Sequence, residues 1–367
     1  MRIELKQVLC PQPKSKIKAS DGKLEGKYKF FTSSPMQTRF IDEANYDKPS
    51  LIFGTGGNAS VHFCDEPFST STDCLVMYGR NTIELESIYN YLKGNISLLE
   101  HGFKGAGLKH ISKDYILAIE IELPSEAMQH EFLQKNRIVD EIIEAKRTQL
   151  LLSEDLVKSR FIEMFGTLSS NEQNFEVLTI ESLCSLIKDG THQTPTYTED
   201  TINGFKFLSS KDVMSTKIDW SDIKYIPSDL HEKLYAVVKP IKNDILMSKN
   251  GVNYGVAAVN DTDEVFDIYV SLALLRPKTD IINPVYFRSA INSPDTKRQF
   301  DSSIKGIGVP NLHLGEIKKT KILVPPVDKQ NEYVSFVEQV DKSKFEIQQS
   351  LEKLEILKKS LMQQYFG

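Results

Sequence analysis

The chain has 367 residues, which is too many for one ordinary hydrophobic core and predicts two or three compact units. Its composition, 40% hydrophobic and 26% charged, is that of a soluble globular protein. The net charge of −5 is unlike the basic footprint of most nucleic-acid binders, although a small basic face would be enough for such a function.

No apolar run approaches the roughly 20 residues that cross a bilayer, and the first residues lack the apolar segment of a secretory signal. We therefore expect no membrane association and a cytoplasmic location. The cysteines and histidines are scattered, with no C-x-x-C or H-E-x-x-H pair, so we expect no metal site and reduced cysteines in the core. These cysteines are Cys10, Cys64, Cys74 and Cys184.

Residues 1–124 form the first predicted unit, which is rich in strand signals. Apolar runs predict short strands at 51–53, 61–63, 75–77 and 116–123. Residues 54–59 match the letters G-x-G-x-x-A of a dinucleotide-binding loop, but that loop needs a helix directly after it. A strand-like run follows instead, so we interpret this segment as a tight β-turn.

Residues 125–166 predict a long helix, because they are rich in Glu, Gln, Lys and Leu and have no glycine or proline in their interior. A helix of this length, about 60 Å at 1.5 Å per residue, needs another helix to bury its apolar stripe. We expect that stripe to consist of Phe132, Val139, Ile142, Leu150, Val157 and Phe161.

Residues 167–326 form the second predicted unit and contain apolar runs at 245–247, 256–259, 270–275 and 317–324. The segment Asn283-Pro284-Val285-Tyr286 resembles the Asn-Pro-Pro-Tyr motif with which adenine N6-methyltransferases hold the target base. Its second proline is missing, and no convincing S-adenosylmethionine-binding βα unit precedes it. We interpret it as an Asn-Pro turn that starts a helix.

Residues 327–367 predict a second long helix, and they belong to an internal repeat. The run 105–108 aligns with 306–309, and the same offset of 201 residues continues without a gap to Phe165-Gly166 and Phe366-Gly367. The alignment has 16 identities in 62 pairs, against roughly four expected from composition. The second helix carries Ile347, Leu351, Leu354, Leu361 and Tyr365 at coiled-coil spacing, interrupted by Lys358.

The second unit also carries a series of loop motifs that resembles the target recognition domains of Type I restriction-modification specificity subunits. Asp189-Gly190-Thr191-His192-Gln193-Thr194-Pro195 is similar to the family's D-G-T-H-x-T-P, and residues 204–208 supply the G-x-x-F-L that follows. Residues 244–251 resemble G-D-I-L-x-S-x-x-G, with Asn243 in place of the first glycine. Residues 306–312, the closing residues 357–366, and 104–111 with Leu123-Pro124 in the first half match as well.

The resemblance implies an α+β fold with two β-rich target recognition domains, 1–124 and 167–326. They are separated by two long spacer helices, 125–166 and 327–367, which form an antiparallel coiled coil with a pseudo-two-fold internal repeat. The chain would read a bipartite site on double-stranded DNA and have no catalytic residues of its own. It would seat two methyltransferase subunits that use S-adenosylmethionine, and restriction/translocase subunits that use ATP and magnesium.

Polar and basic residues of the predicted loops are the candidates for DNA contact. In the second domain they are Lys188, Thr191, His192, Gln193, Lys206, Ser209, Ser210, Lys211, Lys249, Asn250, Asn253 and Tyr254. In the first domain they are Lys27, Lys29, Thr32, Ser33, Ser34, Asn58, Lys104, Lys109 and His110. For each of these residues, capping or stabilising its own loop is the competing interpretation.

Two other functions remain open at this point. A coiled-coil scaffold with two β-rich modules fits the net acidity and predicts no affinity for DNA. A self-sufficient adenine N6-methyltransferase depends on Asn283-Pro284-Val285-Tyr286 alone and predicts binding of S-adenosylmethionine by the isolated chain.

Overall fold

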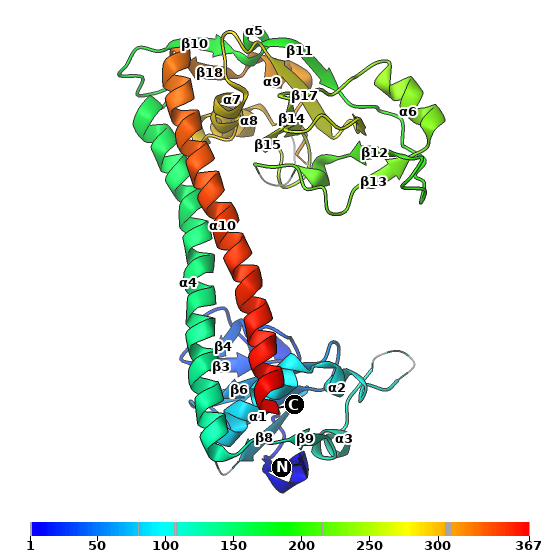
Figure 1. The fold of residues 1–367 in the computed structure, drawn as a ribbon, viewed down its shortest axis with the longest axis vertical. Helices are drawn as coiled ribbons and strands as arrows, with labels where there is room; N and C mark the ends of the chain where they lie inside the picture. The colour runs from blue at the N-terminus through cyan, green and yellow to red at the C-terminus, as the bar shows by residue number, and fades with distance from the viewer. Residues whose placement is uncertain are drawn as a thin grey trace. The chain divides into compact units, whose positions relative to one another are not determined.

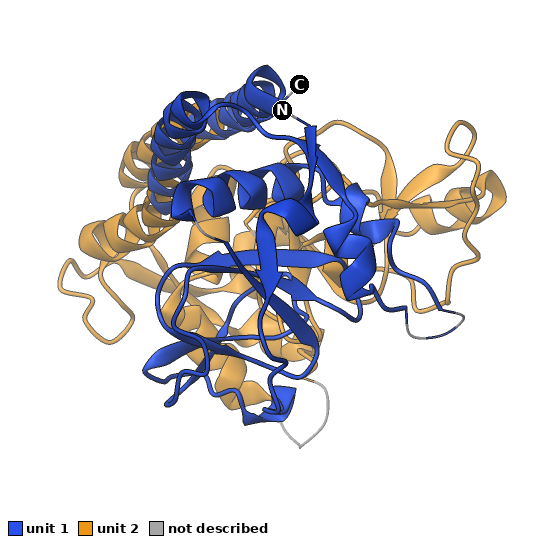
Figure 2. Ribbon diagram, turned by 90° about the horizontal axis from the view of Figure 1, so that it is seen from below, with its two compact units in different colours: residues 1–148, 347–367 blue, residues 149–346 orange. Residues whose placement is uncertain are grey.

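A computed structural model describes residues 2–79, 81–105, 107, 109–213, 216–304 and 310–366. The chain divides into two compact units, shown in Figure 2. Unit 1 contains residues 1–148 and 347–367, and unit 2 contains residues 149–346. Each unit therefore holds a globular part together with a portion of each of the two long helices.

In the part of the chain that the structure describes, unit 1 holds three small sheets, three helices of its own and a portion of each long helix. Figure 1 shows these elements. The strands of unit 1 are β1 (Arg2–Glu4), β2 (Leu9–Pro11), β3 (Tyr28–Phe31), β4 (Arg39–Ile41), β5 (Ser50–Gly54), β6 (Ser60–Cys64), β7 (Phe68–Thr70), β8 (Cys74–Gly79) and β9 (Glu120–Glu122). Its helices are α1 (Thr82–Gly94), α2 (Ser97–Glu100), α3 (Lys113–Leu117) and the first part of α4 (Glu126–Phe165), with short 3-10 turns at Leu5–Gln7 and Ala19–Asp21.

Among its described residues, unit 2 has three sheets of the same sizes, and it also contains the last part of α4. Its strands are β10 (Glu176–Thr179), β11 (Cys184–Asp189), β12 (Phe205–Leu208), β13 (Lys224–Ile226), β14 (Ile245–Ser248), β15 (Ala257–Val259), β16 (Phe266–Ile268), β17 (Leu272–Pro277) and β18 (Lys321–Val324). Its helices are α5 (Ile180–Leu183), α6 (Ser228–Tyr235), α7 (Pro284–Ile291), α8 (Pro294–Ser303), α9 (Leu314–Lys319) and the first part of α10 (Val327–Phe366), with a 3-10 turn at Ser210–Asp212.

The two units repeat one topology strand for strand. The four-stranded sheets have the orders β2-β8-β5-β6 and β11-β17-β14-β15, and the three-stranded sheets have the orders β4-β3-β7 and β13-β12-β16. In both three-stranded sheets one strand pair is parallel, β3 with β7 and β12 with β16. The antiparallel ribbons β1-β9 and β10-β18 complete the match. The predicted repeat thus extends beyond the residues in which it is visible by sequence.

The offset of 201 residues holds for the long helices, because α4 spans 126–165 and α10 spans 327–366. One expectation about this region is wrong. Ile116 and Ile317, expected to begin strands, lie in the short helices α3 and α9, and the strands start only after them. In the first copy the cause is visible, since the Ser112 hydroxyl accepts a hydrogen bond from the Tyr115 amide and so starts a helical turn.

The helices α4 and α10 pack along one heptad seam in opposite directions (Figure 1). In unit 1 the ring of Phe132 lies 5.7 Å from that of Tyr365, and Lys358 pairs with Asp140. In unit 2 the ring of Phe161 lies 5.4 Å from that of Tyr333. Most of the predicted stripe is buried or half-buried: Phe132, Val139, Leu150, Val157, Phe161, Ile347, Leu351, Leu354, Leu361 and Tyr365.

Ile142 is the exception, and its predicted role in helix packing is corrected here. Its side chain is 40% exposed, whereas that of Ile143 is 3% exposed. The seam advances by alternating steps of three and four residues, so it runs from Val139 to Ile143 and on to Leu150. Ile142 falls one position before the seam and faces outward.

Two interpretations of single motifs are confirmed by the structure. Residues 55–59 connect the antiparallel strands β5 and β6, so the glycine-rich segment is a hairpin turn. Asn283 caps helix α7, with its side chain accepting a hydrogen bond from the amide of Val285. Among the described residues, no helix is both long enough and apolar enough to cross a bilayer.

The end of α4 is part of the core of unit 2. The ring of Phe165 is fully buried and lies 4.9 Å from Tyr286, 5.6 Å from Tyr333 and 5.2 Å from Phe161. We therefore expect Phe165→Ala to lower the free energy of unfolding by about 3–5 kcal/mol, because it leaves a cavity among aromatic rings. Denaturant-induced unfolding of the full chain measures this change.

The matched control is Leu156→Ala, in the same helix but with an exposed side chain. It should change the free energy of unfolding by no more than about 0.5 kcal/mol. Equal effects of the two substitutions would contradict the assignment of Phe165 to the core.

Candidate nucleic-acid interface

Several of the predicted loop segments of unit 2 meet around Ser271, directly before strand β17. The Ser271 carbonyl accepts a hydrogen bond from the Lys249 amide at 2.9 Å, and its hydroxyl accepts one from the Ser210 amide at 2.9 Å. The neighbouring Val270 amide donates to the Thr191 carbonyl at 2.9 Å. The loops that follow β11, β12 and β14 therefore lie together at one edge of the sheets.

A buried ion pair joins two of these loops. The Lys249 ammonium lies 2.5 Å from the Asp189 carboxylate, and the Lys249 side chain is only 7% exposed. Lys249, a candidate for DNA contact, is thus committed within the protein, where it fixes the loop after β14 against the end of β11. His192, which follows on the same loop, is exposed and lies 3.9 Å from the same carboxylate.

The loop after β11 is shaped by Gly190 and Thr191. A side chain at Gly190 would place a Cβ atom 2.2 Å from the carbonyl oxygen of Ile268, so glycine alone fits there. Thr191 holds its own turn, since its hydroxyl accepts a hydrogen bond from the Gln193 amide at 3.1 Å. The side chains of His192 and Gln193 are left exposed on this rigid base.

The loop after β12 is held in a similar way. The Asp212 carboxylate accepts hydrogen bonds from the Ser209 amide at 2.7 Å and the Ser209 hydroxyl at 3.2 Å. Lys211 lies 2.9 Å from Asp222. Desolvation would lower the pKa of Lys211, but its pairing with Asp222 and Asp212 raises that pKa overall.

The turn after β14 is fixed at both ends. Asn250 forms an isolated bridge with Asn311, and the Gly251 amide donates to the Pro310 carbonyl at 3.2 Å. Tyr254 donates a hydrogen bond to Asp301, whose pKa is held below its usual range by Lys297 and by this hydroxyl. Asn253 is half-buried in the same turn.

Unit 1 has the same arrangement around Asp73, directly before strand β8. The Asp73 carbonyl accepts hydrogen bonds from the Ser33 hydroxyl at 2.6 Å and from the Thr55 amide at 2.9 Å. The Nδ1 atom of His110 lies 3.0 Å from the Thr55 carbonyl. Ser34 is close by, with its carbonyl 2.9 Å from the Nε2 atom of His62.

The backbone contacts establish which residues correspond in the two units. Thr55 matches Lys249, because their amides bond to Asp73 and Ser271 and their carbonyls accept from Ile111 and Leu312. The bridge between Gly56 and His110 matches the bridge between Asn250 and Asn311. Positions 110 and 311 differ by 201, the offset of the sequence repeat. The same frame therefore carries different side chains in the two units.

The candidate lysines differ in whether a carboxylate already neutralises them. Lys29 and Lys206 occupy equivalent positions on β3 and β12. Lys29 pairs with Glu66, just before the parallel neighbour β7, and Lys206 pairs with Glu264, just before the parallel neighbour β16. Lys27 lies 5.0 Å from the centre of the Tyr28 ring. Within the described residues, the exposed candidates without an ion pair also include Lys104, Lys109 and Lys188.

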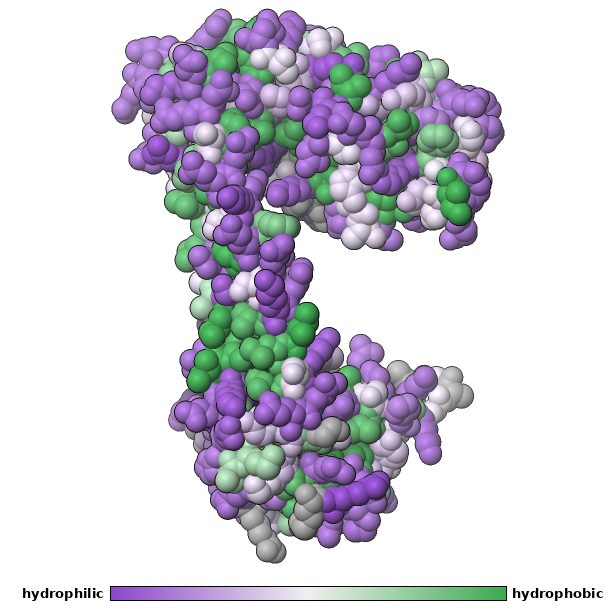
Figure 3. All heavy atoms as spheres, in the orientation of Figure 1, coloured by the Kyte–Doolittle hydropathy of each residue, from purple (hydrophilic) through white to green (hydrophobic). Residues whose placement is uncertain are grey.

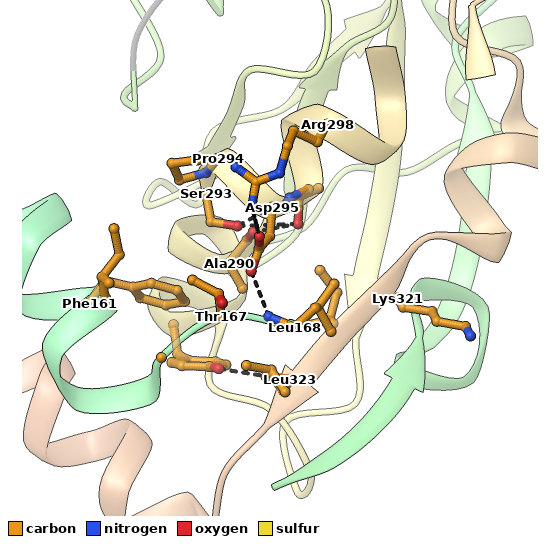
Figure 4. Close-up of a pocket in the computed structure, with 15 residues that line it drawn as sticks. Phe161, Thr167, Leu168, Ala290, Ser293, Pro294, Asp295, Arg298, Lys321 and Leu323 are labelled. Carbon is orange, nitrogen blue, oxygen red and sulfur yellow. Dashed lines mark hydrogen bonds and ion pairs between the residues drawn. The ribbon is translucent and has the colours of Figure 1, made fainter. Parts of the chain in front are cut away.

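A different kind of site lies where α4 meets the body of unit 2. A cavity of about 140 Å³ lies among Phe161, Leu168, Asp295 and Leu323. Figure 4 shows the side chains that line it. The Asp295 carboxylate accepts a hydrogen bond from the Leu168 amide at 2.7 Å and pairs with Arg298. These polar groups thus bind one another, which is typical of a place where a helix packs against a domain and not of a ligand site. Across the described residues, no cluster of His, Cys, Asp or Glu could hold a metal ion.

The sequence profile described as "Type I restriction modification DNA specificity domain" matches residues 2–153 and 172–358. The chain belongs to this family. It is 21% identical to the Type I restriction enzyme MjaVIII specificity subunit of Methanocaldococcus jannaschii, over 93% of this chain and 86% of that protein.

Two solved structures share the fold. One is the Type-I restriction-modification system S subunit from M. genitalium, with a TM-score of 0.58 and 16% identity, covering 100% of this chain and 96% of that chain. The other is from work on complex assembly and conformational transition of the type I R-M system, with a TM-score of 0.63 and 14% identity, covering 100% and 97%. The chain is a specificity subunit of a Type I restriction-modification system, and such subunits are not catalytic.

The structure agrees with the rejection of a methyltransferase motif in this specificity subunit. Tyr286, the aromatic residue of that motif, is fully buried, and its hydroxyl donates a hydrogen bond to the Leu323 carbonyl at 2.8 Å. The residue has no surface with which to hold a base. Asn243, which departs from the family's glycine, has a φ of 72°, a left-handed conformation that asparagine also tolerates.

Sequence reasoning missed three residues of this arrangement. Asp73 organises its loops through its backbone carbonyl, which no side-chain pattern reports, and Ser271 does so through its carbonyl and its hydroxyl. The sequence could have predicted Asn311, because it lies 201 residues after the candidate His110, which is the offset of the repeat. Residues 305–309, which include the second copy of the glycine-rich repeat, and Ala106 and Leu108 of the first copy lie outside the described residues.

The ion pair between Lys249 and Asp189 leads to a prediction about stability. Lys249→Met should lower the free energy of unfolding by about 3 kcal/mol, because it leaves a largely buried carboxylate without its partner. Adding Asp189→Asn should recover much of this loss, since the orphaned charge is then removed. Denaturant-induced unfolding of both variants measures the two changes, and an uncoupled, additive double variant would contradict the ion pair.

Proposed function

We propose that this specificity subunit reads a bipartite site on double-stranded DNA. Each unit contacts one half-site through the loops that meet around Asp73 in unit 1 or Ser271 in unit 2. The observation that carries the proposal is the repeated frame with divergent side chains. Thr55, Gly56 and His110 in unit 1 stand where Lys249, Asn250 and Asn311 stand in unit 2. A repeated backbone that carries different side chains is what two readers of different sequences require.

The charge of these loops is compatible with DNA. The ion pairs of Lys29 and Lys211 are exposed and that of Lys206 is half-buried, and each contributes little stability individually. A phosphate can therefore replace the carboxylate at small cost, while Lys104, Lys109 and Lys188 need no such exchange. The net acidity of the chain does not oppose this local role.

The long helices offer a docking surface for the other subunits. Figure 3 shows apolar side chains gathered on the helices. In unit 1, Met128, Ile138 and Ile142 of α4 are exposed, as are Ile356 and Leu357 of α10. In unit 2, Leu151, Leu152, Leu156 and Ile162 of α4 and Phe345 of α10 are exposed. Side chains of this kind on a soluble chain favour burial against a partner.

We assign these surfaces to two methyltransferase subunits, joined by restriction/translocase subunits. The chemistry then lies in the partners: S-adenosylmethionine serves adenine methylation, and ATP with magnesium serves the nuclease and translocase. The complex works where its DNA is, in the cytoplasm. The competing function is a scaffold that assembles partners without reading DNA.

The first experiment is a methylome. The chain is expressed with its methyltransferase subunit in a host free of DNA methylation, and modified bases are sequenced directly. We expect a split motif with methyladenine in both halves. Replacing residues 1–124 by those of another specificity subunit should change one half and leave the other intact. A stable complex that methylates no adenine would favour the scaffold function.

A second experiment addresses docking on α4. The double substitution Leu152→Lys and Leu156→Lys should weaken binding of the methyltransferase subunit at least tenfold, because two apolar contacts become desolvated charges. The control is Leu24→Lys, an exposed leucine in the globular part of unit 1. Affinity is measured by titration calorimetry, and unfolding midpoints confirm that all variants fold. Equal affinities for both variants would remove α4 from the docking surface.

A further inference from the structure

Val252 is an apolar residue in a place that burial does not explain. Its side chain is 89% exposed and lies in the turn after β14. The residues around it are fixed, because Lys249 pairs with Asp189, the Gly251 amide bonds to Pro310, and Tyr254 bonds to Asp301. A rigid turn therefore presents a β-branched apolar side chain to solvent.

The matching turn of unit 1 presents Asn58 at the same position. Gly57 and Gly251 both have a φ of 79°, and a Cβ atom added to either would meet nothing within 4 Å. Each glycine comes two residues after the position, Thr55 or Lys249, that bonds to Asp73 or Ser271. Asn58 and Val252, the next residues, are therefore structural equivalents, and both are exposed. Beyond them the turns diverge, because the one in unit 2 is longer.

We infer that this position reads a base in each half-site: Val252 contacts the C5-methyl group of a thymine, and Asn58 bonds to the N6 and N7 atoms of an adenine. The inference rests on the proposed function and adds to it one residue and one base class for each unit. The position lies at the edge of the sheets where the polar candidate loops meet. It carries a different side chain in each unit, as expected of residues that read different bases.

The chemistry of valine narrows its target. Val252 has no donor or acceptor, so it can neither bind a phosphate nor read the hydrogen-bonding pattern of a base edge. The thymine methyl group is the apolar feature that the major groove offers. Insertion between base steps is the work of larger wedges such as Phe, Leu, Ile or Met. For Asn58, the paired donor and acceptor of the amide match adenine.

The test uses the complex of the chain with its methyltransferase subunit and a duplex that carries the motif found by the methylome. Each thymine of the second half-site is replaced in turn by deoxyuridine, which lacks only the methyl group. We expect one replacement to weaken binding about fourfold, the effect of removing one buried methyl group. In the Val252→Ala complex the same replacement should have no effect.

The control is Ile202→Ala. Ile202 is 90% exposed but lies ahead of β12, at the end of that strand away from Ser210. Its complex should show the same fourfold preference for thymine as the wild type. The inference is overturned if no thymine of the half-site responds, or if the response persists in Val252→Ala. A wild-type complex that methylates no DNA would instead overturn the proposed function.

The assignment of Asn58 is tested independently in the first half-site. Replacing one adenine by purine, which lacks the N6 amino group, should weaken binding of the wild type by about tenfold or more, on the scale of one bidentate contact. Asn58→Ala should abolish that difference and leave the thymine effect in the second half-site unchanged. A wild type indifferent to every adenine, or an unaltered preference in Asn58→Ala, would rule out the assignment of Asn58.

Discussion

The constraint on which the rest of the structure depends is the apolar seam between α4 and α10. A helix of 40 residues cannot keep such a seam in water, so each helix requires the other. The seam continues into both globular parts, where Phe132 meets Tyr365 in unit 1 and Phe161 meets Tyr333 in unit 2. The stability of each unit is thereby tied to helix pairing.

A second consequence of the repeat is that framework and specificity are separated. Several hydrogen bonds that organise the loops join backbone groups, as from the Thr55 amide to Asp73 and from the Lys249 amide to Ser271, and therefore survive changes of side chain. Residues that do take part, such as Lys249 with Asp189 or Ser209 with Asp212, fix individual loops. The exposed positions between these anchors are free to differ between the units.

The sequence was sufficient for the architecture because helix signals and a repeat extend over many residues. Composition predicted both long helices to within one residue at each end, and the offset of 201 relates one helix to the other. The same offset relates His110 to Asn311, although that pair was not predicted. Sequence reasoning failed where the burial of a single residue was in question. Ile142 and Ile143 are both apolar, and only the phase of the seam separates them. The burial of Lys249 depends on Asp189, which is distant in sequence, and the exposure of Val252 depends on the geometry of its turn.

The acidity of the chain is consistent with a reader whose discrimination exceeds its affinity. Phosphate contacts supply binding that is largely independent of sequence. Where Lys29, Lys206 and Lys211 already pair with carboxylates, a phosphate contact adds less than it would at an unpaired lysine, because it replaces an existing partner. Binding must then depend more on base edges and on the partner subunits. A reader of this kind spends little time on wrong sequences, which suits a specificity subunit that must find one site among many.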